Sequence, residues 1–459
     1  MYRRAATLPS LVAMALLPCL APATPAVETP PNIVVILTDD LGYADLGCYG
    51  NKRIRTPNLD RLAAEGARLT SFYSGGAVCS PTRAALMTGC YPKRVSMHLG
   101  VVMNDDPENG LAPGEFTIAE MMKGHGYATG CFGKWHLGLK PEMMPTAQGF
   151  DSYFGFPGEN HGKSDLVRGL EVVAKLGAWN PVTAAGSITD EAVRFINQNK
   201  DRPFFLHLPH GTPHTPLLAS PQFKDKSQAG LYGDMVEEMD ANCGQILDTL
   251  RSAGLDERTL VLFSSDNGSA SAAAIPFHGG KGSSWEGGMR VPFIARWPKR
   301  IPAGLESNAM VTMMDVMPTV AAFTGATLAK DVRIDGEDVS EVLTRPGTRA
   351  KRDSMLYYNG AGQLAAIRNG TWKLHLIQPK QKYSYPKEAL LDTKPKTKLP
   401  WLYDLDADPG ETVDVASQHQ DVVAQLTAKA GELDGELTAH ARPRADGSIG
   451  PRRRKEDDQ

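Results

Sequence analysis

The sequence predicts an α/β fold: a large, mainly parallel sheet flanked by helices on both faces, plus a smaller C-terminal antiparallel sheet domain with a packing helix. Residues 32–38 (NIVVILT) form a continuous apolar, β-branched run, which is typical of a strand buried on both faces. Similar runs alternate with helical patterns up to about residue 345. Beyond that point, short strand-like runs succeed one another around an Asn369-Gly370 hairpin turn.

The alternation of strand and helix can be followed along the first part of the chain. Thr56-Pro57 opens a helix with a capping residue and a proline in the first turn, and Leu59 and Leu62 mark its inner face. Residues 158–179 lack periodicity, and we expect them to form loops over the site. Further helices are predicted at 117–123, 189–199 and 231–253, and further strands at 127–132, 203–208 and 259–264.

After residue 345 the alternation of strand and helix patterns gives way to consecutive short strand patterns, so two domains are expected. The first is an N-terminal α/β domain over residues 30–345, and the second is a C-terminal α+β subdomain over residues 346–441. Residues 442–459 are charged and lack apolar periodicity, which predicts a disordered tail. In the second domain we expect strands at 355–358, 364–368, 372–377 and 401–405, and a helix at 417–439.

The N-terminus carries the pattern of a secretory signal peptide over residues 1–26. Basic residues precede an apolar run, residues 8–20, and a stretch of small residues follows. The run is too short for a membrane span, so we expect an exported protein, periplasmic or secreted. Lipid anchoring at Cys19 is the alternative, although Pro18 is unusual before such a site. The net charge of -3 gives no indication of nucleic-acid binding.

The segment Cys79-Ser80-Pro81-Thr82-Arg83 predicts an anion site at a helix N-terminus. Pro81 fits the first turn of a helix, and the apolar residues that follow continue it. Unpaired backbone N–H groups and the helix dipole favour an anion near Cys79, and Arg83 adds a fixed charge. The geometry suits a tetrahedral oxyanion. Taken alone, the pentapeptide would also fit a buried structural cysteine beside a capping arginine.

Two pairs of oxygen-bearing residues close two predicted strands. Asp39 and Asp40 follow the first strand, and Asp266 and Asn267 follow the strand at 259–264. Open α/β sheets place their ligand sites at such strand ends. Carboxylate and amide oxygens without histidine or thiolate suit a hard cation such as calcium or magnesium.

Two further segments carry lysine toward the same kind of ligand. In Gly133-Lys134-Trp135-His136, alternate residues of an extended segment point the same way, so Lys134 and His136 are expected to face one anion. Lys281 lies on a glycine-rich loop, and such loops can approach an anion closely.

In this order, the motifs resemble those of the formylglycine-dependent sulfatases, the arylsulfatase-like family of the alkaline phosphatase superfamily. The resemblance implies that a formylglycine-generating enzyme oxidises Cys79 to formylglycine. It also implies one calcium ion, held by Asp39, Asp40, Asp266, Asn267 and the modified Cys79. Further implied roles are a base at His136, sulfate contacts from Arg83 and Lys134, and leaving-group contacts from Lys281 and from His214 of Pro213-His214-Thr215-Pro216.

The sequence departs from the family pattern after Gly155-Phe156-Pro157. The arylsulfatase branch carries a sulfate-contacting serine after such a segment, whereas here Gly158-Glu159-Asn160-His161 follows. Asn160 and His161 are therefore the candidates to replace that serine in substrate binding.

The implied function is hydrolysis of sulfate monoesters, either aryl sulfates or carbohydrate sulfates, with a sulfated small molecule or glycan as substrate. One hydroxyl of the hydrated aldehyde attacks sulfur, and the sulfo-enzyme intermediate breaks down as the aldehyde re-forms. A phosphate or phosphonate monoester hydrolase on the same fold is the alternative, although two-metal phosphatases commonly carry an Asp-His pair where Asp266-Asn267 stands. A non-catalytic glycan-binding relative is a third possibility, but such a protein should have lost one of the ligands.

Overall fold

A computed structural model of the chain describes residues 1–2, 30–159, 164–175, 181–271, 276–379 and 397–449. Most of the predicted signal peptide lies outside the described residues, as do the two candidate substrate-binding residues Asn160 and His161. Residues 450–459 of the predicted tail lie outside them as well.

The N-terminal domain is built on a ten-stranded sheet in the order β11-β2-β10-β9-β1-β8-β4-β5-β6-β7. The strands from β9 to β5 pair in parallel, and antiparallel pairs join β10 to β9 and to β2 on one flank and β6 to β5 and β7 on the other. The prediction of a large, mainly parallel sheet is therefore confirmed. Its strands are β1 (Asn32–Thr38), β2 (Ala67–Leu69), β4 (Ala128–Lys134), β5 (Ser152–Phe156), β6 (Leu166–Arg168), β7 (Glu171–Ala174), β8 (Phe204–Pro209), β9 (Thr259–Ser265), β10 (Phe293–Arg296) and β11 (Leu305–Ser307); β3 (Phe72–Tyr73) and β12 (Val311–Thr312) form a separate pair.

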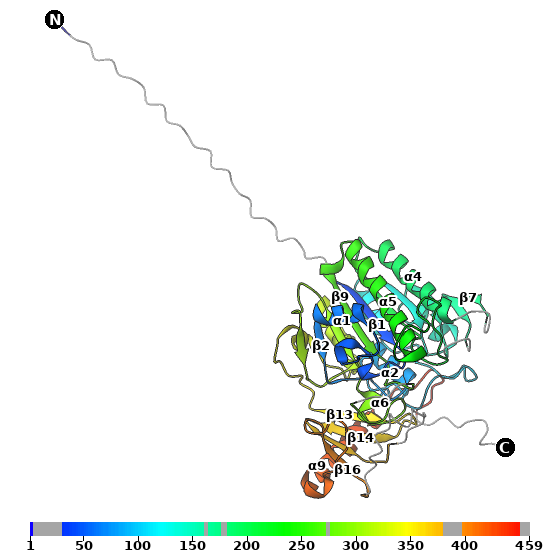
Figure 1. Cartoon of the computed structure of the whole chain (residues 1–459), viewed down its shortest axis with the longest axis vertical. Helices are drawn as coiled ribbons and strands as arrows, with labels where there is room; N and C mark the ends of the chain where they lie inside the picture. The colour runs from blue at the N-terminus through cyan, green and yellow to red at the C-terminus, as the bar shows by residue number, and fades with distance from the viewer. Residues whose placement is uncertain (3–29, 160–163, 176–180, 272–275, 380–396, 450–459) are drawn as a thin grey trace.

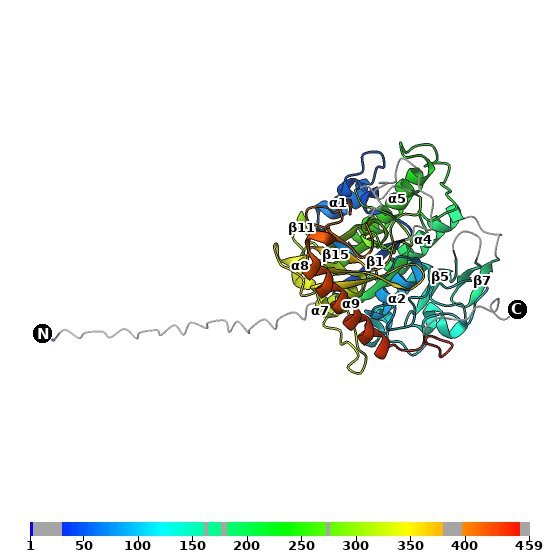
Figure 2. The ribbon, with the colours of Figure 1, turned by 90° about the horizontal axis from the view of Figure 1, so that it is seen from below.

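Helices cover both faces of this sheet, as the apolar run of β1 requires. Ile33 and Val35 of β1 pack into one cluster of buried side chains, and Val34 and Ile36 pack into another. Figure 2 shows α1, α5 and α4 on one side of β1, and α2 and α7 on the other. The helices of this domain are α1 (Pro57–Ala64), α2 (Cys79–Thr88), α3 (Ile118–Gly124), α4 (Pro181–Gln198), α5 (Gly230–Ser252), α6 (Glu286–Met289), α7 (Val316–Thr324) and α8 (Ser340–Thr344).

The C-terminal domain is a four-stranded antiparallel sheet with one helix packed on it, as predicted. The strands β13 (Ser354–Tyr358), β14 (Leu364–Asn369), β15 (Trp372–His375) and β16 (Trp401–Asp404) are neighbours in chain order. Leu426 and Ala430 of α9 (Gln420–Ala439) pack against Leu356 and Ile367 of the sheet. Figure 1 shows this domain against the end of the large sheet near α6.

Two segments that were predicted to be irregular, residues 158–179 and the start of the C-terminal tail, differ from that prediction. The predicted loop region 158–179 contains the short strands β6 and β7, which extend the large sheet. Strands of three or four residues are too short to give a readable alternation in the sequence. Residues 442–449, the described part of the predicted tail, pack against the rest of the chain, because Arg442 is ion-paired with Glu115 and Arg444 is buried.

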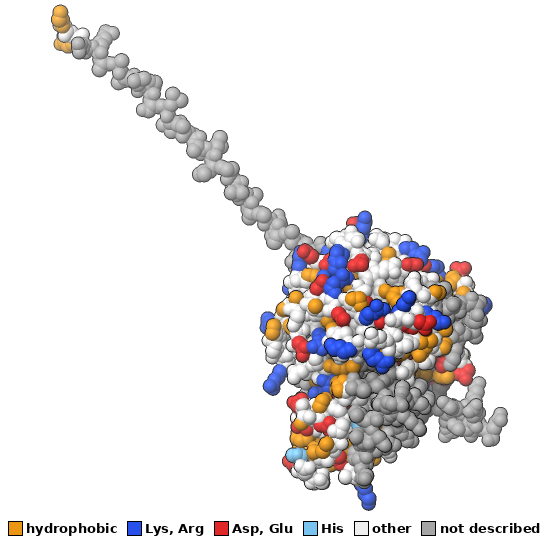
Figure 3. All heavy atoms as spheres, in the orientation of Figure 1, with side chains coloured by type: hydrophobic (Ala, Val, Ile, Leu, Met, Phe, Trp, Pro, Cys, Tyr) orange, Lys and Arg blue, Asp and Glu red, His pale blue; other side chains and the backbone are white. Residues whose placement is uncertain are grey.

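The surface mixes both signs of charge. In Figure 3, lysine and arginine side chains are interspersed with aspartate and glutamate over the visible face. In the described part of the chain, none of the helices has the length and apolar character that a membrane crossing needs. All five cysteines described, which are Cys48, Cys79, Cys90, Cys131 and Cys243, are free.

Candidate active site

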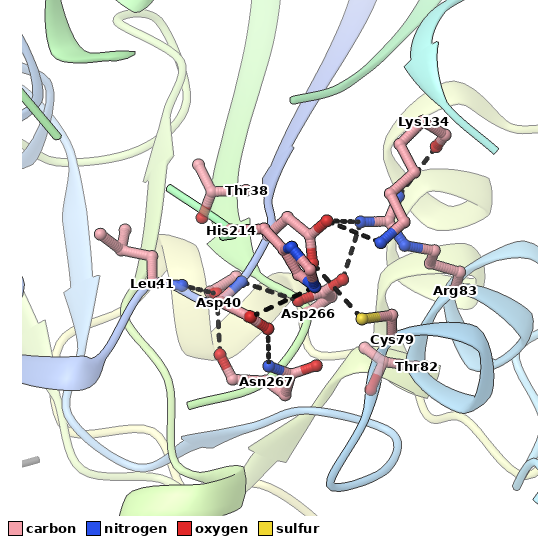
Figure 4. Close-up of polar contacts among 12 residues, drawn as sticks. Thr38, Asp40, Leu41, Cys79, Thr82, Arg83, Lys134, His214, Asp266 and Asn267 are labelled. Atoms are coloured by element: carbon pink, nitrogen blue, oxygen red, sulfur yellow. Dashed lines mark hydrogen bonds and ion pairs between the residues drawn. The ribbon is translucent and has the colours of Figure 1, made fainter. Parts of the chain in front are cut away.

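The two predicted pairs of oxygen-bearing residues meet because β1 and β9 pair in parallel and in register. Thr38 is the register partner of Ser265, so Asp39-Asp40 and Asp266-Asn267 leave the sheet side by side. The backbone N–H of Asp40 donates to Oδ1 of Asp266 at 3.2 Å, and Nδ2 of Asn267 donates to Oδ1 of Asp40 at 2.6 Å (Figure 4). All four side chains are buried.

Three cationic side chains converge on these acids from other elements. Nη2 of Arg83, in α2, lies 2.7 Å from Oδ2 of Asp266. Nζ of Lys134, at the end of β4, lies 2.7 Å from Oδ2 of Asp39, and Nζ of Lys281 lies 2.6 Å from Oδ1 of Asp40. Three carboxylates and three cations thus share one buried site, and Figure 4 shows Arg83 and Lys134 beside the carboxylates.

The surroundings of Asp39 and Asp266 shift the pKa values of these two carboxyls in opposite directions. Burial alone would raise the pKa of Asp39, but the charges of Lys134, His214 and Arg83 outweigh it and hold that pKa well below its ordinary value. Burial, together with the neighbouring Asp39, raises the pKa of Asp266 to about 7. Without an additional cation, one carboxyl of this group therefore approaches neutrality at physiological pH.

Cys79 occupies the predicted position at the start of α2. Val78 is the extended N-cap residue, and Gly89 ends the helix with a left-handed φ of 66°. Sγ of Cys79 lies 3.4 Å from Oδ1 of Asp39. Burial raises the pKa of the Cys79 thiol, and Asp266 and Asp39 raise it further. An unmodified thiol is therefore protonated in this setting.

His136 reaches the site by a different backbone path from the one expected. It is left-handed, with φ of 62°, so the prediction that Lys134 and His136 alternate on one extended segment is wrong. Nε2 of His136 lies 2.9 Å from the carbonyl oxygen of Val102, while Nδ1 has no hydrogen-bond partner among the described residues. Burial lowers the pKa of His136 well below its usual value, and Lys134 and Arg83 lower it further, so the ring is neutral.

His214 lies at the edge of the carboxylate cluster. Its Nδ1 donates to the carbonyl oxygen of Thr215 at 2.6 Å, and its Nε2 is 3.6 Å from Oδ2 of Asp40. Burial is the main cause that lowers its pKa. Among the described residues, Asp39, Asp40, Cys79 and His214 form a group that could hold a metal ion, with ligand atoms within 4.8 Å of one another.

The donor set fits a hard divalent cation. Oδ1 of Asn267 is buried without a hydrogen-bond partner in the described chain, although its Nδ2 is fully engaged. A buried amide oxygen is costly to leave unpaired, and a cation would satisfy it. The cation would also relieve the repulsion among the three neighbouring carboxylates.

Two supporting residues were not among those predicted from the sequence. Oγ of Ser265 accepts the backbone N–H of Leu41 at 3.0 Å and so fixes the turn after Asp40. The hydroxyl of Tyr232 contacts the carbonyl oxygen of Asp40 at 3.3 Å and Oδ2 of Asp45 at 2.5 Å. Tyr232 lies on a helix that was predicted, but no local pattern indicates that its hydroxyl reaches another element.

The comparisons with known proteins agree with this geometry. The family model described as Sulfatase matches residues 31–326, and the one described as the C-terminal region of aryl-sulfatase matches residues 350–449. The chain belongs to the sulfatase family. This sulfatase is 35% identical to human arylsulfatase A over 90% of both chains, and 34% identical to mouse steryl-sulfatase over 89% of its own length and 83% of the relative's.

A solved structure supports the same assignment. The PsFucS1 sulfatase from Pseudoalteromonas sp. matches this sulfatase with a TM-score of 0.78 at 27% identity, covering 90% of this chain and 91% of that one. The similarity spans both domains. The family assignment therefore rests on the whole architecture as well as on the motifs.

Proposed function

We propose that this sulfatase, a sulfuric ester hydrolase, acts on sulfate monoesters through a formylglycine formed from Cys79, with one bound calcium ion. The observation that carries the proposal is the position of Cys79 at the start of α2. Its side chain is directed at Asp39 inside a buried site of three carboxylates and three cationic side chains. Such a site suits an anionic substrate and a cation together.

The calcium ligands we propose are Asp39, Asp40, Asp266, Asn267 and the side chain that replaces the thiol of Cys79. The oxygen-only side chains and the unpaired Oδ1 of Asn267 support this choice. When bound, the ion supplies positive charge that stabilises the sulfate oxygens and the developing oxyanion. With the carboxylates engaged by the ion, Lys134 and Lys281 are available to bind the oxygens of the sulfate group.

Two histidines, His136 and His214, serve the two proton transfers of the proposed reaction. Formylglycine supplies a hydrated aldehyde as the nucleophile. After sulfation this group expels sulfate as the aldehyde re-forms, a route that a sulfated serine or cysteine does not have. His136 presents an unprotonated Nδ1, which suits a general base for the hydroxyl of that group. We place His214 on the side of the departing alcohol, and Arg83 holds the charged oxygens from the helix side.

The substrate class we propose is a sulfated small molecule or glycan, aryl or carbohydrate. Because the relatives include an arylsulfatase and N-acetylgalactosamine-6-sulfatases, both kinds of ester deserve assay. We also propose that the protein is exported, periplasmic or secreted, after removal of residues 1–26. Asn160 and His161, which precede β6, are proposed as substrate contacts on the family pattern alone.

The test is mass spectrometry of the peptide that contains Cys79, on protein co-produced with a formylglycine-generating enzyme. We expect an aldehyde in place of the thiol, and a turnover rate that rises in proportion to its content. Cys79→Ala should abolish turnover, whereas the control Cys48→Ala should leave both the modification and turnover unchanged. Full activity in protein that retains an unmodified Cys79 thiol would contradict the proposal.

A phosphate or phosphonate monoester hydrolase is the competing assignment. Asn267 occupies the position where a two-metal phosphatase commonly has a histidine, and no second metal group is found in the described residues. We expect kcat/KM for a sulfate ester to exceed that for the corresponding phosphate and phosphonate monoesters. The reverse order would favour the alternative.

A further inference from the structure

A buried group of charged side chains joins the C-terminal sheet to α6. We call Glu286, Lys373, His375 and Glu411 the interdomain ion network. Glu286 begins α6, Lys373 and His375 lie on β15, and Glu411 lies in the segment between β16 and α9. All four side chains have no exposed surface. Figure 1 shows α6 next to the C-terminal sheet.

Lys373 lies between the two carboxylates of this network. Its Nζ is 2.8 Å from Oε1 of Glu286 and 2.9 Å from Oε1 of Glu411. Nε2 of His375 lies 2.7 Å from the same oxygen of Glu411. Burial opposes ionisation of Glu286, yet its pKa is lowered to about 2 because Lys373 and Arg290 stabilise the carboxylate. The network is therefore ionic and not merely hydrogen-bonded.

The network contacts the glycine-rich loop, residues 277–289, on both sides of Lys281, through a backbone N–H at Glu286 and through the side chain of His278. Oε2 of Glu411 accepts the backbone N–H of Glu286 at 2.7 Å, and the carbonyl oxygen of Glu411 contacts Nδ1 of His278 at 3.1 Å. The ring of Trp285 also packs against His375, with centroids 4.6 Å apart. Residues of the C-terminal domain thus contact the loop on either side of Lys281.

The loop combines internal hydrogen bonds, such as Gly287 N–H to the carbonyl oxygen of His278 at 2.8 Å, with several glycines. Gly279 and Gly282 flank Lys281 with φ of 69° and 83°, a region in which glycine retains wide freedom in the absence of other contacts. The N-terminal domain holds the middle of the loop by backbone bonds from Lys281 to Ser269 and from Gly282 to Ala77. It holds the C-terminal end of the loop by bonds from Gly268 to Gly288 and from Ser74 to Met289. Asp40 contacts Nζ of Lys281 directly, while contacts from both domains set the path of the loop that carries Lys281.

The ion pairs of the network are not needed merely to hold the two domains together. A second contact between the domains exists at Arg94, which bridges Asp335 and Glu436 of α9. Apolar residues of similar volume commonly hold buried interfaces as well as ion pairs do. Buried, fully paired charges instead favour one geometry over its neighbours, because a small displacement leaves a charge unpaired.

We propose that Lys373 and Glu411 are positioning residues for Lys281: the C-terminal sheet fixes the glycine-rich loop through Glu286 and so sets where the Lys281 ammonium meets the substrate anion. This inference rests on the proposed role of Lys281 in binding sulfate. It makes the C-terminal domain part of the binding site without contact to the substrate.

A double-mutant cycle tests the proposal, using Lys373→Met, Lys281→Ala and the double variant in calcium-loaded, formylglycine-containing enzyme. The readouts are KM and kcat for a sulfate ester and the inhibition constant of inorganic sulfate. We expect Lys373→Met to raise KM and the sulfate inhibition constant by about 2- to 30-fold. In the Lys281→Ala background the same substitution should add nothing, because its effect acts through Lys281.

Two further variants separate positioning from stability. Arg94→Met removes a buried cation from the other interdomain contact, so it should lower the melting temperature and leave KM unchanged. If Lys373→Met does not fold, Lys373→Met/Glu286→Gln removes one charge of each sign, and the same changes in KM are expected.

The possible outcomes are distinct. An unchanged KM in the folded Lys373 variants, or an equal rise in KM in both backgrounds, would overturn the positioning role. If Lys281→Ala leaves KM and sulfate inhibition unchanged, the assignment of Lys281 in the proposed function fails first, and the positioning inference falls with it. A rise in KM from Arg94→Met as large as that from Lys373→Met would show a general loss of domain docking and overturn it too.

Discussion

The ring of His136 is oriented by the carbonyl oxygen of Val102, which lies 2.9 Å from Nε2. A carbonyl oxygen only accepts, so Nε2 carries the proton and Nδ1 keeps its lone pair. This tautomer is the one a general base needs, and the left-handed backbone of His136 helps to direct the ring. The relationship supports the proposed role of His136 as the general base.

His136→Ala should lower kcat for a sulfate ester by roughly 10²–10⁴-fold, the range that general base catalysis contributes. The pKa of His136 is lowered, so the neutral ring is present above that value and is lost only as the pH falls well below 6.5. The acid limb of the pH–kcat profile should accordingly lie below pH 6.5. Steady-state kinetics with the exposed His125→Ala as control checks both points, and an acid limb centred above pH 6.5 would contradict the assignment.

Removal of calcium should abolish turnover, and calcium should restore it better than magnesium does. The proposed site offers several oxygen ligands on two strand ends, a set that suits the larger and more flexible coordination of calcium. Elemental analysis should find one calcium per chain. Asn267→Ala should weaken calcium binding measured by titration, whereas the surface variant Asn197→Ala should not. Zinc, or two metals per chain, would contradict the one-calcium site.

Much of this site could be predicted from local sequence. The apolar runs of β1 and β9 each end in a pair of oxygen-bearing residues, and parallel pairing then brings Asp39 and Asp266 together. Pro81 and Gly89 define α2 and so place Cys79 at its start. These features depend on patterns within a few residues.

Other parts depend on contacts between distant segments and could not be predicted in this way. Glu286 and Lys373 are 87 residues apart, and neither has a local pattern that indicates burial. The left-handed φ of His136 depends on its tertiary surroundings, since few residues other than glycine adopt that region and no turn pattern in the sequence marks this one. Arg442 looks like part of a solvated tail until its partner Glu115 is known.

Glu286→Gln should make stability less sensitive to acid. The pKa of Glu286 is about 2 in the folded chain and ordinarily 4.5, so the carboxylate stabilises the fold above pH 4.5, and this contribution is lost as the pH falls toward 2. The shift corresponds to about 3 kcal/mol of unfolding free energy. Denaturant unfolding should show Glu286→Gln less stable than wild type at pH 7 by up to that amount, with the difference shrinking toward pH 3. A difference that does not depend on pH would exclude this linkage.

His214→Ala should affect sugar sulfates far more than nitrophenyl sulfate. Nδ1 of His214 donates to Thr215, so Nε2 is the nitrogen that faces Asp40 and the site. Nε2 can pass a proton to the departing oxygen only from the doubly protonated ring, a form that burial disfavours and that the charges of Asp39 and Asp40 favour. A sugar alkoxide is much more basic than nitrophenolate and depends on that proton. We therefore expect kcat/KM to fall by roughly 10²–10⁴-fold for a sugar sulfate and far less for the aryl ester. If both substrates lose activity equally, His214 only binds the sulfate group, and Lys281 becomes the candidate acid.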